Sequence, residues 1–234
     1  MRTIVIGGKR VHIFLPEGSV RLKIWTHMQP DEAAALFERA GGGTALFAAD
    51  DYDWNADLSP WPAKACFRGG EDFAGRGPER LRWLGEAVPV AEEGIADAPR
   101  AILGYSLAGL FALWAAAERN ELFDAAASVS GSLWYDDFAG YIAARAHLFA
   151  GKAAYLSLGD REAKTRNARL ACVQEAAETA RDVLCAAGAR AVFELNPGNH
   201  FNDPTGRCAR AVEWLKEAMG TLGDSVPYNH CQGE

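Results

Sequence analysis

The sequence predicts one α/β domain with a mostly parallel central sheet, antiparallel strands at its N-terminal end and helices on both faces. Two observations carry this prediction. Apolar, strand-like runs alternate with segments of helical spacing over most of the chain, which is typical of parallel strands joined by right-handed helical crossovers. No repeat, low-complexity tract or linker divides the 234 residues, a length that suits one covered sheet. We therefore expect residues 1–234 to form a single domain, with 221–234 as a polar C-terminal tail.

Three short apolar runs open the chain, at residues 3–6, 10–15 and 20–26. Gly7-Gly8 and the Pro-Glu-Gly segment at 16–18 separate them as turn signals. Strands joined by such tight turns pair antiparallel, so these runs are expected to form the antiparallel margin of the sheet.

A helix is predicted from Pro30 to about residue 40, because proline is favoured in the first turn of a helix. The three glycines at 41–43 end this helix, and residues 44–49 form the next apolar strand. Residues 1–49 are therefore expected to form four strands of the sheet and one helix that packs on it.

Residues 50–77 lack periodicity and are rich in aromatic, acidic and proline residues. Long stretches of this kind inside a compact domain are usually functional or disordered. Trp54 and Trp61 argue against disorder, since such rings need a surface on which to pack.

The second half of the chain continues the alternation of helices and strands. Helices are expected from Pro78 onward with a kink or interruption at Pro89, after Ser106, over 136–150, over 166–187, and at the C-terminal end around Val212; strands are expected at 101–105, 123–129, 153–158 and 191–195.

Residues 101–111 have the pattern of a nucleophile elbow, a sharp strand-to-helix turn that presents a serine hydroxyl above the end of a sheet. Such a turn needs small neighbours, and Gly104 and Ala108 flank Ser106 at two residues on either side. Ala108 stands where the usual motif has glycine. The same short pattern also fits a serine in an ordinary loop between a strand and a helix, so the elbow requires support from the rest of the chain.

That support comes from the ends of the later strands. A parallel α/β sheet places its chemistry beyond the carboxyl ends of its strands. The strand at 153–158 is followed by Gly159-Asp160-Arg161-Glu162, and the last strand is followed by Asn199-His200. The order serine, acid, histidine is that of α/β-hydrolases, in which the histidine activates the serine and the acid orients the histidine.

His200 is the predicted base, because it follows the final strand in a glycine-containing loop. His12, His147 and His230 suit packing or surface positions better. His27 ends the third strand and fits a role in the oxyanion loop better than that of the base.

The acid is predicted to be Glu162, with Asp160 as the alternative. Glu162 lies three residues after Gly159, which gives its carboxylate room to turn back toward His200. Asp160 follows the glycine directly.

The oxyanion hole is expected to use two backbone N–H groups. One belongs to Leu107, the residue after the nucleophile, at the positive end of the following helix. The other comes from the loop after the third strand, where this chain has His27-Met28-Gln29 in place of a His-Gly pair. We assign it to Gln29, with Met28 as the alternative.

Composition excludes several classes of function. The net charge is −7 without a basic cluster, which disfavours nucleic acid and anionic membranes as partners, and no apolar run is long enough to span a membrane. The five cysteines have no Cys-x-x-Cys spacing, so we expect free thiols and neither a zinc site nor a catalytic cysteine. The glycine pairs lack the spacing of nucleotide-binding motifs. With no signal-peptide pattern at the N-terminus, a cytoplasmic location is predicted.

Four segments together resemble a known family: 104–111 (GYSLAGLF), 130–134 (SGSLW), 157–162 (SLGDRE) and 196–201 (NPGNHF). They are similar to the putative esterase family of the α/β-hydrolase superfamily, which contains enterochelin (siderophore) esterase-like enzymes and, more distantly, esterase D. The likeness spans roughly residues 45–205.

This resemblance implies a serine hydrolase that cleaves a small-molecule carboxylic ester through an acyl-enzyme, without a metal or organic cofactor. It would make Ser106 the nucleophile, His200 the base and the loop carboxylate the third member. A thioesterase or acyltransferase with the same triad, or a non-catalytic binding protein of this fold, are the alternatives. Trp54, Trp61 and Trp134 suit either a substrate pocket or packing.

Overall fold

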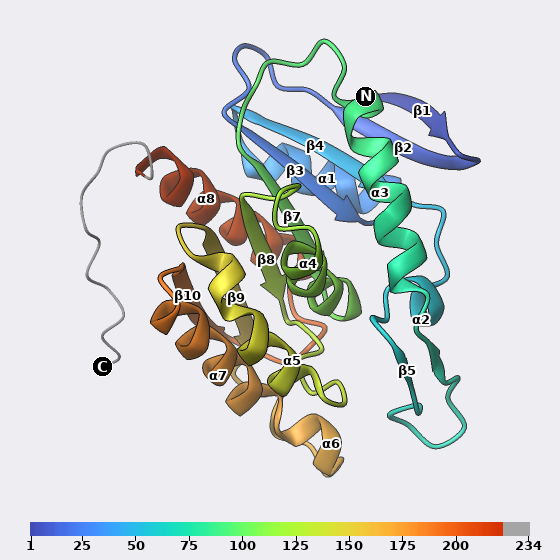
Figure 1. Cartoon of the computed structure of the whole chain (residues 1–234), viewed down its shortest axis with the longest axis vertical. Coiled ribbons are helices and arrows are strands. Elements are labelled where there is room, and N and C mark those ends of the chain that lie inside the picture. Colours follow the sequence, from blue (N-terminus) through green and yellow to red (C-terminus); the bar gives the residue numbers. More distant parts are fainter. Residues whose placement is uncertain (222–234) are drawn as a thin grey trace.

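The computed structural model describes residues 1–221, which form one sheet of eight strands flanked by helices (Figure 1). The order of the strands across the sheet is β1-β2-β4-β3-β7-β8-β9-β10. Their bounds are β1 (Arg2–Ile6), β2 (Lys9–Phe14), β3 (Leu22–His27), β4 (Thr44–Ala49), β7 (Arg100–Tyr105), β8 (Ala125–Val129), β9 (Ala153–Gly159) and β10 (Arg190–Asn196).

The sheet is antiparallel only at its N-terminal margin. β1 pairs with β2 and β2 pairs with β4 antiparallel, whereas every pairing from β4 and β3 across to β10 is parallel. This arrangement confirms the predicted fold class, because the parallel strands are joined by helical crossovers. The third opening run was expected in the antiparallel margin, but the turn after β2 leads to a strand that is not its neighbour, and β3 pairs parallel with β4 and β7. All the carboxyl ends of the parallel strands therefore meet at one edge.

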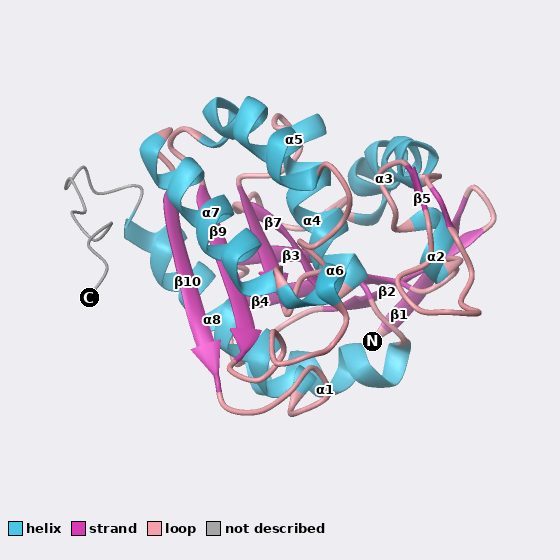
Figure 2. Cartoon of the chain, turned by 90° about the horizontal axis from the view of Figure 1, so that it is seen from below, coloured by secondary structure: helices cyan, strands magenta, loops and turns pink. Residues whose placement is uncertain are grey.

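Helices cover both faces of the sheet (Figures 1 and 2). One face carries α3 (Gly77–Ala91), α4 (Leu107–Glu118), α5 (Phe138–Arg145) and α7 (Val173–Ala186), and the other carries α1 (Pro30–Ala40) and α8 (Pro204–Thr221). Each face buries its own apolar cluster against the sheet. Because both faces of the sheet are covered, polar side chains can gather only beyond the ends of the strands.

Helix α4 is buried on all sides. Every residue from Leu107 to Ala117 is buried, because the helix packs against β7 and β8 and also contacts α5. A helix that is apolar all round is typical of such a central position. This burial fixes the N-terminus of α4, and with it Ser106, relative to the sheet.

The segment that lacks periodicity is ordered. It contains the short helix α2 (Trp54–Asp57) and a small hairpin of β5 (Pro62–Ala63) and β6 (Phe73–Ala74) that projects from the body of the domain (Figure 1). Asp53 begins α2 by accepting a hydrogen bond from the N–H of Ala56.

Three helices differ from their predicted form: two are shorter or divided, and one is continuous where an interruption was expected. The helix expected at 136–150 begins only at Phe138, because Asp137 adopts a left-handed conformation with φ of 64°, and it ends in the 3₁₀ turn η1 (Ala146–Phe149). The helix expected at 166–187 is divided into α6 (Ala168–Ala171) and α7. Helix α3 contains Pro89 and continues to Ala91, so the helix is not interrupted at this proline.

Within residues 1–221, no helix is long and apolar enough to cross a membrane. Cys66, Cys172 and Cys208 are free thiols, as expected. The predicted tail after Thr221, with His230 and Cys231, lies outside the described residues, and the cytoplasmic location stays a prediction.

Candidate active site

Ser106 lies in the turn between β7 and α4 with a strained backbone. Its φ of 59° and ψ of −122° place a non-glycine residue in a region that costs of order 1–3 kcal/mol. Neighbouring backbone holds this conformation: the Ser106 N–H donates to the carbonyl of Val129 at 3.0 Å, and the Ser106 carbonyl accepts from the N–H of Ser132 at 3.0 Å. The turn thus has the strained geometry that the elbow pattern predicts.

Gly104 is required by the close approach of the two arms of this turn. A Cβ atom at Gly104 would lie 2.0 Å from the carbonyl oxygen of Ala108. Ala108, which stands where the usual motif has glycine, lies in the first turn of α4, and its side chain is buried in the core. The critical small position is therefore Gly104, two residues before Ser106.

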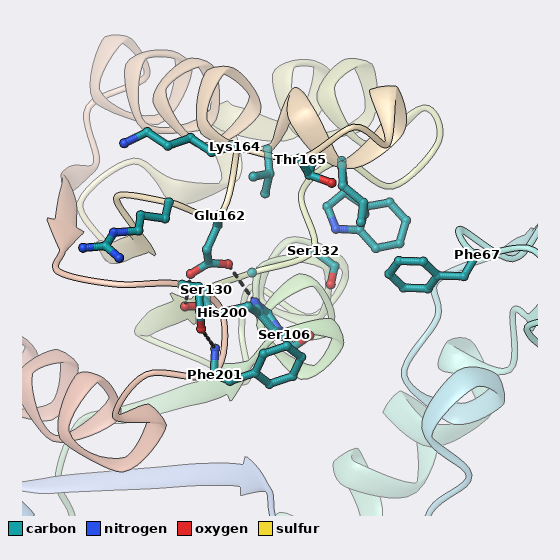
Figure 3. A pocket seen from close by; sticks show the side chains of 15 residues that line it. Phe67, Ser106, Ser130, Ser132, Glu162, Lys164, Thr165, His200 and Phe201 are labelled. Atoms are coloured by element: carbon teal, nitrogen blue, oxygen red, sulfur yellow. Dashed lines mark hydrogen bonds and ion pairs between the residues drawn. The ribbon is translucent and has the colours of Figure 1, made fainter.

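Ser106, His200 and Glu162 form a continuous hydrogen-bonded chain (Figure 3). The Nε2 atom of His200 is 3.0 Å from the Oγ atom of Ser106. The Nδ1 atom of His200 is 2.7 Å from the Oε2 atom of Glu162. The three residues follow β7, β10 and β9 respectively, so the parallel sheet brings together side chains that are up to 94 positions apart in the sequence.

Asp160 makes a different contact. Its Oδ1 atom accepts a hydrogen bond of 2.8 Å from the N–H of Gly198, and its side chain is about half exposed. Asp160 thereby ties the loop after β9 to the loop after β10. Of the two acids considered from the sequence, the structure places Glu162 against His200.

Glu162 is buried and held as a carboxylate. Its Oε1 atom accepts hydrogen bonds from Gly159 N–H at 2.6 Å, Ser130 Oγ at 2.8 Å and Arg207 Nη1 at 2.9 Å. Burial by itself raises the pKa of Glu162, but the hydrogen bonds from His200, Gly159 and Ser130 outweigh it. The resulting pKa lies below its ordinary value, so the group is ionised at neutral pH.

The first N–H groups of α4 lie beside Ser106. The Ser106 carbonyl accepts from the N–H groups of Gly109 and Leu110, which leaves the N–H of Leu107 outside the helical pattern, at the positive end of the helix. Leu107 lies at the same cavity as Ser106. This is the arrangement expected of an oxyanion donor.

The loop after β3 places Met28 and Gln29 differently. The N–H of Gln29 donates to the Oε2 atom of Glu32 at 3.3 Å, in a capping arrangement that begins α1. Met28 is buried and lines a cavity together with Ser106 and His200. The predicted donor Gln29 is thus engaged in capping, whereas the alternative Met28 lies at the cavity.

His27 is buried and neutral. Its Nε2 atom accepts a hydrogen bond of 2.9 Å from Nε of Arg80, which is itself buried. Burial and the positive charge of Arg80 hold the pKa of His27 well below its ordinary value. Because its only free lone pair is used by Arg80, His27 has no capacity to act as a base toward Ser106.

Three cavities meet at Ser106, with volumes of about 510, 210 and 340 Å³. We name them the large, small and intermediate lobes. Trp134 lines the large and small lobes, and Trp54 lines the small and intermediate lobes. Trp61 instead packs against Tyr135 and donates its Nε1–H to the carbonyl of Asp136, so it takes the packing role.

No group of three or more histidine, cysteine, aspartate or glutamate side chains is arranged to hold a metal ion within residues 1–221. The polar atoms around Ser106 are instead used in hydrogen bonds among themselves.

Comparison with known families identifies the family of this chain. A family model described as "Putative esterase" matches residues 79–200, which run from helix α3 through the elbow to His200. The chain belongs to this esterase family. Membership supports the predicted enzyme class, a carboxylic ester hydrolase.

Individual relatives of the esterase are distant. The uncharacterized protein YbbA of Bacillus subtilis (strain 168) is 28% identical over 115 residues, which are 47% of this chain and 46% of YbbA. The chain thus matches about half the length of that curated relative.

Solved structures show the same fold. The siderophore hydrolase EstA from Aspergillus nidulans superposes with a TM-score of 0.69 at 19% identity, over 92% of this chain and 93% of EstA. An IroE-like serine hydrolase from Shewanella oneidensis gives 0.75 at 15% identity, over 89% and 76% of the two chains. Est1E from Butyrivibrio proteoclasticus, with bound ferulic acid, gives 0.60 at 14% identity, over 94% and 100%.

Arg207 of the esterase is a site residue that the sequence patterns did not predict. This side chain is 1% exposed and binds both Oε1 of Glu162 and Oγ of Ser130 through Nη1, each at 2.9 Å. Its Nη2 atom donates to the carbonyls of Pro197 and Asn199, at 3.2 and 3.0 Å, in the loop that carries the histidine. One guanidinium therefore joins the acid to the loop after β10.

A signal for Arg207 does exist in the sequence. Arg207 lies four and eight residues before Ala211 and Leu215, both fully buried on the core-facing side of α8. A charged residue on an apolar stripe is expected to be buried with a partner. The partner itself, Glu162, is visible only in the fold.

Replacing Arg207 with methionine is expected to lower the free energy of unfolding by about 3–5 kcal/mol, because the change leaves a buried carboxylate without its ion-pair partner. Urea unfolding at neutral pH measures the loss. Arg39→Met removes an exposed arginine that lies 3.1 Å from Asp203, and it is expected to leave the unfolding free energy nearly unchanged. Equal losses in the two variants would contradict the role assigned to Arg207.

Proposed function

We propose that this protein hydrolyses a small-molecule carboxylic ester with Ser106 as nucleophile, His200 as general base and acid, and Glu162 as the group that orients His200. The observation that carries the proposal is the unbroken chain from Ser106 Oγ through the His200 ring to the Glu162 carboxylate. Membership of the esterase family supports the same class of reaction.

In the first half of the reaction, Oγ of Ser106 attacks the ester carbonyl while Nε2 of His200 takes the hydroxyl proton. The carbonyl oxygen becomes an oxyanion. His200 then gives its proton to the alkoxide oxygen as the bond to the carbonyl carbon breaks, which releases the alcohol and leaves an acyl-enzyme on Ser106.

In the second half, water attacks the acyl-enzyme and passes a proton to His200. The tetrahedral intermediate then breaks to the carboxylic acid, and the Ser106 oxygen recovers its proton. The buried Glu162 carboxylate stabilises the imidazolium in both halves, which its lowered pKa permits over the neutral range.

We infer that the oxyanion is held by the N–H groups of Leu107 and Met28. Leu107 contributes the positive end of α4, and Met28 lines the intermediate lobe beside Ser106 and His200. The N–H of Gln29 already donates to Glu32, which disfavours it as the donor.

The solved structures of the same fold include a siderophore hydrolase and Est1E with bound ferulic acid, and the match to the esterase family supports an ester as the substrate. A thioesterase or acyltransferase would use the same residues, and a binding protein would use none of them. One experiment separates the last possibility from the others.

Incubation with a fluorophosphonate probe is expected to attach one probe molecule to Ser106, located by peptide mass spectrometry, and to stop the hydrolysis of p-nitrophenyl acetate. The reason is that the probe reacts with an activated serine hydroxyl and not with an ordinary one. Two outcomes would overturn the proposal. One is that the probe does not label Ser106, and the other is that it labels Ser106 fully although the protein hydrolyses neither esters nor thioesters.

A further inference from the structure

Three exposed aromatic side chains surround Ser106. Among residues 1–221, few large apolar side chains are exposed, and Trp54, Phe67 and Phe201 are among them, with exposed fractions of 41%, 63% and 83%. All three line cavities that also contain Ser106. Exposed rings that gather at one cleft indicate a surface meant to be covered by a ligand.

Each ring stands where two of the three lobes meet. Phe67 lines the large and small lobes, Phe201 lines the large and intermediate lobes, and Trp54 lines the small and intermediate lobes. Figure 3 shows Phe67 and Phe201 reaching the cavity from different segments of the chain. The cleft is thus divided in three directions around Ser106.

The carbonyl carbon of a bound ester also has three substituents, which point in three directions. The carbonyl carbon above Ser106 carries the carbonyl oxygen, the acyl group and the leaving oxygen, about 120° apart before attack. The oxygen must face the N–H groups of Leu107, at the small lobe, and Met28, at the intermediate lobe. The side shared by these two lobes is the side of Trp54.

The leaving oxygen must receive its proton from Nε2 of His200. His200 lines the large and intermediate lobes and is absent from the lining of the small lobe. The side shared by the large and intermediate lobes is that of Phe201, whose ring packs edge-on to the His200 ring at a centroid distance of 5.3 Å. The remaining direction, toward Phe67, is left for the acyl group.

We propose that Phe67 contacts the acyl group and Phe201 contacts the leaving alcohol, so that the substrate is an ester with an apolar group on each side of its carbonyl. This inference rests on the proposed serine mechanism. It goes further by assigning the two sides of the cleft and by making these two rings the residues that select each half of the substrate.

Phe67→Ala and Phe201→Ala test the assignment because only the acyl group remains on the enzyme after the alcohol leaves. In Phe67→Ala, the preference in kcat/KM for p-nitrophenyl hexanoate over p-nitrophenyl acetate is expected to fall about tenfold. The rate of hydrolysis of the hexanoyl-enzyme, measured after the burst in stopped flow, is expected to change as well. The preference for benzyl acetate over ethyl acetate should stay as in the unmodified protein.

Phe201→Ala is expected to give the opposite pattern. Its preference for benzyl over ethyl acetate falls about tenfold, whereas its preference between the two acyl chains and the rate of hydrolysis of the hexanoyl-enzyme stay unchanged. Each preference is a ratio measured on one variant, so a general loss of activity cancels. Leu195→Ala removes another exposed apolar side chain, one that lies on β10, and should alter neither ratio.

An exchanged pattern, in which Phe67 controls the alcohol and Phe201 the acyl chain, overturns the assignment, and so does a lack of change in both variants. The proposed mechanism is tested by a different variant. Hydrolysis that persists in Ser106→Ala would show that no acyl-enzyme forms on Ser106, whatever the results with the two phenylalanine variants.

Discussion

Ser106→Ala, His200→Ala and the double variant are each expected to lower kcat for p-nitrophenyl acetate by about 10⁶-fold, with the double variant no worse than either single one. In the proposed mechanism the two side chains act as a unit, because the hydroxyl of Ser106 is not a competent nucleophile until His200 Nε2, at 3.0 Å, takes its proton. Removal of either partner therefore removes the whole contribution. The oxyanion donors and the cleft account for what remains.

Ser128→Ala is the matched control. It removes a buried serine hydroxyl on β8 that makes no hydrogen bond among residues 1–221, so kcat is expected to stay within a few-fold of that of the unmodified protein. Urea unfolding of all variants checks that the fold is retained. Independent, multiplying losses in the Ser106 and His200 variants would show that the two residues do not act on one proton.

Glu162→Gln is expected to lower kcat by about 10⁴-fold, whereas Asp160→Ala should retain nearly all activity. Glutamine keeps the shape of Glu162 but removes the charge that stabilises the imidazolium, and its amide can present a donor to Nδ1 of His200, which favours the wrong tautomer. Asp160 contacts Gly198 instead and is half exposed. The measurement is kcat and kcat/KM for p-nitrophenyl acetate at pH 7 and above.

The pH dependence of stability has a sign that follows from the same carboxylate. The folded-state pKa of Glu162 lies below its ordinary value near 4.5, so its ionised form is favoured by folding. Its contribution is fully present above that ordinary value and is lost as the pH falls through the lowered folded-state pKa. Glu162→Gln should remove this part of the pH dependence.

Loss of activity in Asp160→Ala with retention in Glu162→Gln would exchange the roles of the two acids.

The local pattern was sufficient for most of the fold. Apolar runs and glycine and proline signals predicted every strand of the main sheet to within a few residues, because most of these strands are buried and buried strands are apolar in sequence. The pattern failed where a single backbone conformation decided the outcome. The left-handed Asp137, which precedes the first residue of α5, and Cys172, at which α6 ends and α7 begins, leave no trace in apolar periodicity.

The sequence by itself was enough to predict Ser106, His200 and an acid as the reacting groups, since the elbow around Ser106 and the polar residues after the last two strands are short-range patterns. Only the tertiary structure decided between Glu162 and Asp160, placed Met28 at the cavity, and joined Arg207 to the acid. The physical reason is that these choices depend on which strand ends lie side by side and on the direction of each side chain. Spacing along the chain carries neither kind of information, whereas the folded backbone fixes both.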